Sequence, residues 1–186
     1  MFKKTLITVL LLVSFTYASE VNGWTIPKSF PKFRQCDSRW GHEIMVNKTI
    51  CKVGCLMSSV AMALNGFGYK INGKTANPST LNTFLQKNGG YVGNQLLVYA
   101  AVCKINPKIT FVGMYKGVGS VSRNTIKNYL DSKKYAVIGH VRSGSHYVLI
   151  DGYSSDLNKF HVLEPAYADD SYNYNNIVGY RIYKMA

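Results

Sequence analysis

The sequence predicts an α+β domain in which helices come first and antiparallel strands follow. Through residues 55–134, apolar residues recur mainly at helical spacing, in segments bounded by Gly, Pro and capping residues. The last third instead contains short runs of β-branched and aromatic residues separated by Gly, Ser, Asn and Asp. An apolar content of 47% and 14 tyrosines favour a folded body over a disordered chain. Helices that precede the strands are typical of the α+β class.

The start of the chain has the layout of a secretory signal peptide. Two lysines precede a short apolar run, and small residues end at Ala18. The run is shorter than the about 20 apolar residues of a membrane-spanning helix, and we expect no membrane span. We therefore expect a signal peptide at residues 1–18 and one domain at residues 19–186, because that length suits a single core. The expected location is secreted and extracellular, or the lysosomal or vacuolar lumen.

Four segments are predicted as helices from their apolar spacing and their capping residues. They are residues 55–64, 77–90, 94–105 and 122–134. Ser79 or Thr80 is the expected cap of the second helix. Ser122 or Asn124 is the expected cap of the fourth. Before Trp40 the chain is predicted to be irregular, because two prolines discourage a helix.

Five short runs are predicted as strands, the last four of them following one another as a meander. They are residues 109–115, 135–141, 146–153, 159–165 and 177–185. The third and fourth strands should form a hairpin that sets His146 opposite Ala166, with Glu164 as a diagonal neighbour. A histidine and a carboxylate then reach the same edge of the sheet. A register slip of one residue would turn them to opposite faces.

Cys55 is the candidate nucleophile. It stands where a loop enters the first predicted helix, and unpaired N–H groups at a helix N-terminus favour a thiolate. Gly54 precedes it and lets the backbone approach a substrate carbonyl closely. The Cys55 N–H is itself a potential donor to a developing oxyanion. A disulfide or a buried thiol is the alternative interpretation of this cysteine.

A thiolate nucleophile requires a base, and the base requires a partner that orients it. His146 and Glu164 provide that pair on the predicted hairpin, with a surface His–Glu contact as the alternative. His140 is the second candidate base, although its place within a strand favours a packed role. His42 and His161 are expected to be structural or exposed. The sequence contains no metal-binding motif and no phosphate loop, so we expect no metal and no cofactor.

Four cysteines in a secreted chain normally indicate two disulfides. If Cys55 is reactive, the other three form one bridge and leave one thiol over. We expect the bridge to join Cys36 to Cys51, with Cys103 as a buried free thiol. A bridge between Cys51 and Cys103 is the competing arrangement.

The surface is expected to be strongly basic. The formal net charge of +13 is scattered along the chain and favours adhesion to anionic surfaces such as cell walls, anionic lipids or acidic polysaccharides. No nucleic-acid-binding motif accompanies this charge, so we expect no nucleic-acid partner. Asn47 begins an Asn-Lys-Thr sequon, which is a glycosylation site if the host is a eukaryote.

Several stretches together resemble the family-39-like cysteine peptidases. They are "QCDSRW" (35–40), "TICKVGC" leading into "SSVAMAL", "SHYVLIDGY" and "VLEP", in the order of that family. The opening signature Q-x-D-x-R-W is matched at Gln35, Asp37, Arg39 and Trp40. These peptidases are papain-fold domains related to the peptidases that trim bacteriocin leaders. The resemblance therefore implies a papain-like cysteine peptidase fold, with N-terminal helices packed on a C-terminal antiparallel sheet.

By this resemblance, Cys55 is the nucleophile, His146 is its general base and Glu164 orients the imidazole. Glu164 stands where the family usually has Asp, which lengthens the orienting arm by one methylene. A Leu-Met step also replaces the Gly-Pro that usually follows the cysteine. Papain-type enzymes place an oxyanion-stabilising glutamine before the nucleophile, and Gln35 is the candidate here.

The sequence thus predicts a secreted, monomeric cysteine peptidase-like hydrolase that needs no cofactor. Its expected substrate is a peptide, a protein or a cell-wall peptide. A peptidoglycan amidase or endopeptidase of similar chemistry is the alternative among enzymes, since the basic charge suits an anionic wall. A catalytically inactive papain-fold binding module is the alternative outside enzymes, because the acid and the step after the cysteine both depart from the family pattern.

Overall fold

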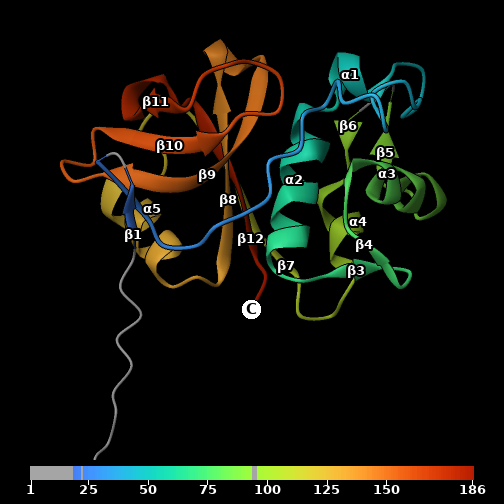
Figure 1. Cartoon of the computed structure of the whole chain (residues 1–186), viewed down its shortest axis with the longest axis horizontal. Coiled ribbons are helices and arrows are strands. Elements are labelled where there is room, and N and C mark those ends of the chain that lie inside the picture. The colour runs from blue at the N-terminus through green and yellow to red at the C-terminus, as the bar shows by residue number, and fades with distance from the viewer. Residues whose placement is uncertain (1–18, 22, 94–95) are drawn as a thin grey trace, which may run out of the picture.

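The structure is a computed structural model that describes residues 19–21, 23–93 and 96–186. The predicted signal peptide, residues 1–18, and the first two residues of the predicted helix 94–105 lie outside the described residues. An eight-stranded antiparallel sheet with one helix occupies one half of the molecule, and the other helices with two small hairpins occupy the other half (Figure 1). This mixture of helices and antiparallel sheet confirms the predicted α+β class.

The described part of the chain contains five α-helices. They are α1 (Ile50–Val53), α2 (Cys55–Gly66), α3 (Pro78–Lys87), α4 (Tyr99–Cys103) and α5 (Arg123–Asp131). Ser122 caps α5, as predicted, and accepts a hydrogen bond from Thr125 N at 3.1 Å. The predicted cap of α3 is wrong, because Asn77 is the cap and accepts from Thr80 N at 2.9 Å. Within the described residues, none of the helices has the length and apolar character required to cross a bilayer.

The predicted helix 94–105 is wrong at residues 96–98. α4 spans only Tyr99–Cys103, and a short strand, β6 (Leu96–Leu97), precedes it. β6 pairs antiparallel with β5 (Tyr91–Val92), and Val98 N then donates to Gly90 O at 2.8 Å. Apolar spacing over so short a run does not distinguish a helix from a hairpin strand, and here the hairpin forms.

The five predicted strands are all present, each within two residues of its expected ends. They are β7 (Thr110–Lys116), β8 (Tyr135–Val141), β9 (His146–Ser154), β10 (Lys159–Leu163) and β12 (Gly179–Lys184). The sheet order is β1-β2-β9-β8-β12-β7, with β10 on β9 and β11 on β10. β12 lies between β8 and β7, so the predicted meander holds only from β8 to β10.

Seven further strands among the described residues were not expected from the sequence pattern, β5 and β6 among them. The others are β1 (Ser19–Val21), β2 (Trp24–Ile26), β3 (Lys70–Ile71), β4 (Lys74–Thr75) and β11 (Ser171–Asn173), of which β3 and β4 form a separate hairpin. β2 corrects the expectation that the chain is irregular before Trp40, because Trp24 pairs with Ser154 of β9. Two prolines exclude a helix there, but they do not exclude a strand that precedes both of them.

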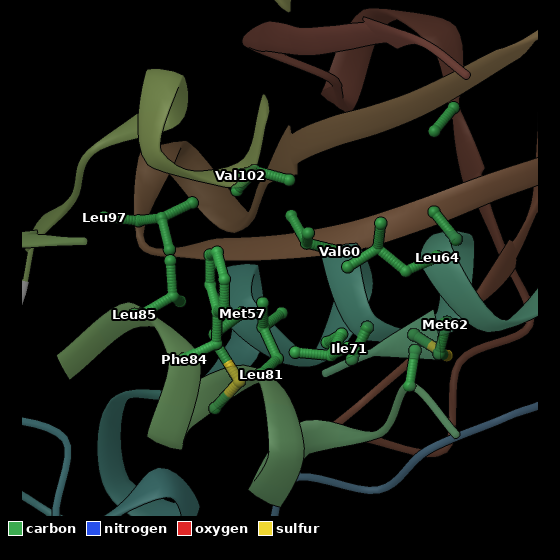
Figure 2. Close-up of a cluster of buried hydrophobic side chains, with 14 of the residues drawn as sticks. Met57, Val60, Met62, Leu64, Ile71, Leu81, Phe84, Leu85, Leu97 and Val102 are labelled. Atoms are coloured by element: carbon green, nitrogen blue, oxygen red, sulfur yellow. The ribbon is translucent and has the colours of Figure 1, made fainter. Parts of the chain in front are cut away.

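Two apolar clusters cover the opposite faces of the sheet. Neighbouring residues of β8 alternate between them: Ile138 belongs to the cluster that includes α2, and Val137 to the cluster that includes α5. Side chains of α2 and α3, among them Met57 and Leu81, meet in the first cluster (Figure 2). α2 is buried continuously from Met57 to Leu64. Burial of this length holds α2 firmly, and with it the position of its first residue.

A β-bulge determines the face of the sheet on which Glu164 lies. The pairing of β10 with β9 shifts between His161 and Val162, which leaves Asp151 of β9 as an extra residue. Because side chains alternate along a strand, this extra residue in β9 places His146, at the start of β9, on the same face as Glu164 after β10. Asp151 is buried and its carboxylate is 2.6 Å from His161 Nδ1, so the bulge has its own polar contact.

Candidate active site

Cys55 is the first residue of α2 and follows directly on α1. Gly54 joins the two helices and donates its N–H to Ile50 O at 2.7 Å. A Cβ on Gly54 would lie 2.5 Å from the same oxygen, so the tight junction itself requires glycine. No side chain caps α2, which leaves N–H groups of its first turn available to an anion near the sulfur.

The cysteines separate into one disulfide and two thiols. Cys36 and Cys51 form the disulfide, so the competing bridge between Cys51 and Cys103 is absent. Cys55 and Cys103 are free and partly exposed. Burial raises the pKa of the Cys103 thiol, which disfavours its thiolate. Cys55 lines a cleft, which Cys103 does not border.

His146 is held between Cys55 and Glu164. It is the first residue of β9, and its ring is almost fully buried. Nε2 lies 2.6 Å from Glu164 Oε1, which leaves Nδ1 for the Cys55 sulfur. Burial alone would favour the neutral ring. Hydrogen bonds with Cys55 and Glu164 outweigh it and raise the pKa of His146 to about 9.

Glu164 is completely buried and accepts four hydrogen bonds. Oε1 accepts from His146, from Ala166 N at 2.8 Å and from Tyr167 N at 3.1 Å. Oε2 accepts from Tyr172 Oη at 3.1 Å. Burial opposes ionisation, but the bond from His146 and the backbone N–H bonds lower the pKa of Glu164. The longer arm of Glu thus reaches the imidazole and two backbone groups together.

Tyr167 and Tyr172 were not identified from the sequence. The Tyr167 ring meets the His146 ring edge-on, with centroids 5.0 Å apart and planes at 79°. The Arg142 guanidinium lies over the Tyr167 ring, 3.7 Å from its centroid, and pairs with Asp169. The available signal was that both tyrosines follow the "LEP" motif within a few residues. Residues that follow an orienting acid in the sequence also lie beside it in space.

Cys55 and His146 open into a cleft of about 700 Å³. It is bordered by residues of α1, α2, β9 and the segment after Glu164. A free thiol at a helix N-terminus, an imidazole at the same cleft and a buried carboxylate behind the imidazole are the parts of a thiol nucleophile with its base and orienting acid.

The model of the Peptidase_C39 like family matches residues 28–184. The chain belongs to the Peptidase_C39 like family. This membership confirms the resemblance drawn from the sequence motifs, and it makes the protein cysteine peptidase-like. The comparison with curated proteins finds no match.

Gln35 of this C39-like chain lies at the same cleft and is 93% buried, with 7% of its surface exposed. Its Nε2 donates to Cys51 O at 2.6 Å, and its backbone N donates to Pro165 O at 2.8 Å. The second N–H of Nε2 has no bond in the described structure, and neither has Oε1. The Cys36–Cys51 disulfide ties the segment of Gln35 to α1, just before Cys55.

The other histidines of the C39-like chain have separate places. His140 Nε2 is 2.7 Å from Gly144 O, and burial lowers the pKa of His140, so it is a poor base for Cys55. His161 is paired with Asp151, a partner that the sequence did not reveal, and His42 is exposed. Asn47 is also exposed. Among the described residues, no group of three or more His, Cys, Asp or Glu side chains is placed to hold a metal.

Proposed function

We propose that this chain is a secreted hydrolase of papain-like fold that cleaves peptide or amide bonds through Cys55, His146 and Glu164. The observation that carries the proposal is the position of His146, with one ring nitrogen on a buried carboxylate and the other toward a free thiol at a helix N-terminus. Membership of the Peptidase_C39 like family supports the same reaction class.

In the proposed reaction, His146 accepts the thiol proton and the Cys55 sulfur bonds to the carbonyl carbon of the scissile amide. The negative charge moves to the carbonyl oxygen, where the Cys55 N–H and the second N–H of Gln35 Nε2 are the candidate donors. The His146 imidazolium then protonates the amine as the C–N bond breaks. Water, activated by His146, hydrolyses the remaining thioester and restores the thiol.

Location and natural substrate are part of the proposal. The predicted signal peptide supports secretion, and the net charge of +13 supports contact with an anionic surface such as a cell wall. A peptide crosslinked into such a wall is the second candidate substrate. Parallel incubations with purified peptidoglycan and with unmodified proteins show, from the products released, which of the two candidate substrates is hydrolysed.

Alkylation by iodoacetamide tests the proposed nucleophile. At neutral pH we expect Cys55 to react at least about tenfold faster than Cys103, because it alone has an imidazole partner. Replacing His146 with alanine should remove this advantage. Mass spectrometry of the digested protein measures both sites, and Cys103 is the internal control. Equal labelling of the two cysteines would favour an inactive binding module.

Hydrolysis should fall as the pH rises through about 9, the pKa of His146. Below this pH the imidazole carries the proton that the leaving amine needs, and above it that proton is lost. The measurement is kcat/KM against pH with one peptide substrate, from pH 6 to pH 10. A rate that still increases at the alkaline end would contradict the assignment of His146 as the proton donor.

A further inference from the structure

Arg181 of β12 is a buried cation behind the wall of the cleft. Only 5% of its surface is exposed. Within the described residues, no Asp or Glu forms an ion pair with it. Arginine keeps its charge in proteins, and a buried charge without a counter-ion is unfavourable. The fold therefore keeps a positive charge here that no described carboxylate neutralises.

Two tyrosine hydroxyls occupy the place of a counter-ion. Arg181 Nε donates to Tyr99 Oη at 2.7 Å, and Nη2 donates to Tyr147 Oη at 2.9 Å. Nη1 donates to Tyr180 O at 3.0 Å. These oxygens solvate the guanidinium with their dipoles but leave its net charge unchanged. Both Tyr99 and Tyr147 line the cleft that contains Cys55.

The two hydroxyls retain protons of their own. A phenol oxygen that accepts from a guanidinium can still donate its O–H. Among the described residues neither hydroxyl donates a hydrogen bond, so the protons of Tyr99 and Tyr147 remain for a group in the cleft. Burial raises the pKa of Tyr147 to about 12, which keeps it a neutral donor. The cation behind these hydroxyls polarises them toward an anion.

The rest of the cleft also favours an anion. Among the described residues that line it there is no Asp or Glu, and Lys52 adds a positive charge. Tyr147 follows His146 in β9 and lines the same cleft as Cys55. An anion bound at the hydroxyls would therefore lie near the bond that Cys55 attacks.

We propose that Tyr99 and Tyr147, backed by Arg181, form a subsite for a carboxylate of the substrate. The inference rests on the proposed hydrolase function and names its substrate class. That class is peptides with a carboxylate near the scissile bond. The carboxylate comes from an acidic side chain or from a free C-terminus, and both present the same planar anion to the hydroxyls.

Matched peptides test the subsite. Alanine-based hexapeptides carry Glu or Gln at each position in turn, and a second series carries a C-terminal carboxylate or amide. We expect at least one acid to be hydrolysed with a kcat/KM about tenfold above its neutral partner. The position of the preferred Glu, or a preference confined to the free C-terminus, identifies the source of the carboxylate.

Phenylalanine variants assign the preference to the hydroxyls. Tyr99→Phe and Tyr147→Phe keep the rings that pack in the cleft wall, and each should reduce the acid-to-neutral ratio toward one. Tyr129→Phe removes the hydroxyl of a tyrosine on α5 that does not line the cleft, and it should leave the ratio unchanged. Arg181 itself is left intact, because its replacement within the core risks unfolding the protein.

Binding to the Cys55→Ala protein separates the two proposals. Calorimetric titration with the same peptide pairs tests the carboxylate subsite even without turnover. Equal affinity and equal kcat/KM for acid and neutral peptides would overturn the subsite while leaving the hydrolase standing, and so would a preference that survives both phenylalanine changes. Preferential binding without any hydrolysis by the unmodified chain would retain the subsite and overturn the hydrolase.

Discussion

Cys55→Ala is expected to lower peptide hydrolysis by at least about 10⁴-fold, because no other group replaces an attacking sulfur. The fold should persist. Cys55 forms no disulfide and is partly exposed, and alanine is the best helix former. The free energy of unfolding should therefore change by less than about 1 kcal/mol. Peptide hydrolysis and thermal unfolding of the same preparation measure both effects.

Cys103→Ala is the matched control for the loss of a free thiol. Cys103 packs against the core, so this change should lower stability more than Cys55→Ala does and leave hydrolysis within about twofold. Full activity of the Cys55 variant would remove the proposed nucleophile. Unfolding of that variant would show that Cys55 has a structural role that its free thiol does not indicate.

Glu164→Ala is the second change with a large expected effect. It removes a fully buried carboxylate that accepts from His146, from two backbone N–H groups and from Tyr172. Donors left without a partner in a buried site cost about 3–5 kcal/mol in total. The imidazole also loses its orientation, so kcat/KM should fall by roughly 10²- to 10⁴-fold.

Glu164→Gln separates the charge of this residue from its geometry. The amide oxygen of glutamine can replace Oε1, and its NH2 can donate to the Tyr172 hydroxyl, so stability should fall less than in Glu164→Ala. Without the negative charge, the imidazolium of His146 loses support. The alkaline decline of kcat/KM should then begin at a lower pH. Equal losses of activity in both variants would indicate that Glu164 contributes charge and no orientation.

Local patterns were sufficient for much of the fold. β8, β9 and α5 follow from β-branched runs and from a Ser cap, since each signal lies within the element itself. The helical pattern at 94–105 failed because its outcome depends on pairing with Tyr91, a contact outside the segment. Asn77 was overlooked as a cap because a proline separates it from the apolar pattern.

The candidate site was foreseen where chain order determines geometry. A hairpin brings His146 and Glu164, 18 positions apart in the chain, to one edge of the sheet. The register at the turn does not continue to Glu164, because the bulge at Asp151 shifts it, and the sequence pattern did not reveal that bulge. The prediction that Cys55 lies beside His146 came from the family resemblance and not from residue spacing. The sequence did not identify Arg181 as part of the cleft wall, because its partner Tyr99 is 82 positions away. No motif near either residue predicts their contact.

Asp151 of β9 has no partner residue in β10. Whether Glu164 and His146 share a face of the sheet therefore depends on the number of residues between them, as well as on their attraction for each other. One residue fewer in β9 would put His146 and Glu164 on opposite faces of the sheet. A relative that lacks the insertion must therefore carry its acid one position earlier or later along the chain. An alignment column alone would misidentify that acid, whereas a strand-by-strand count would find it.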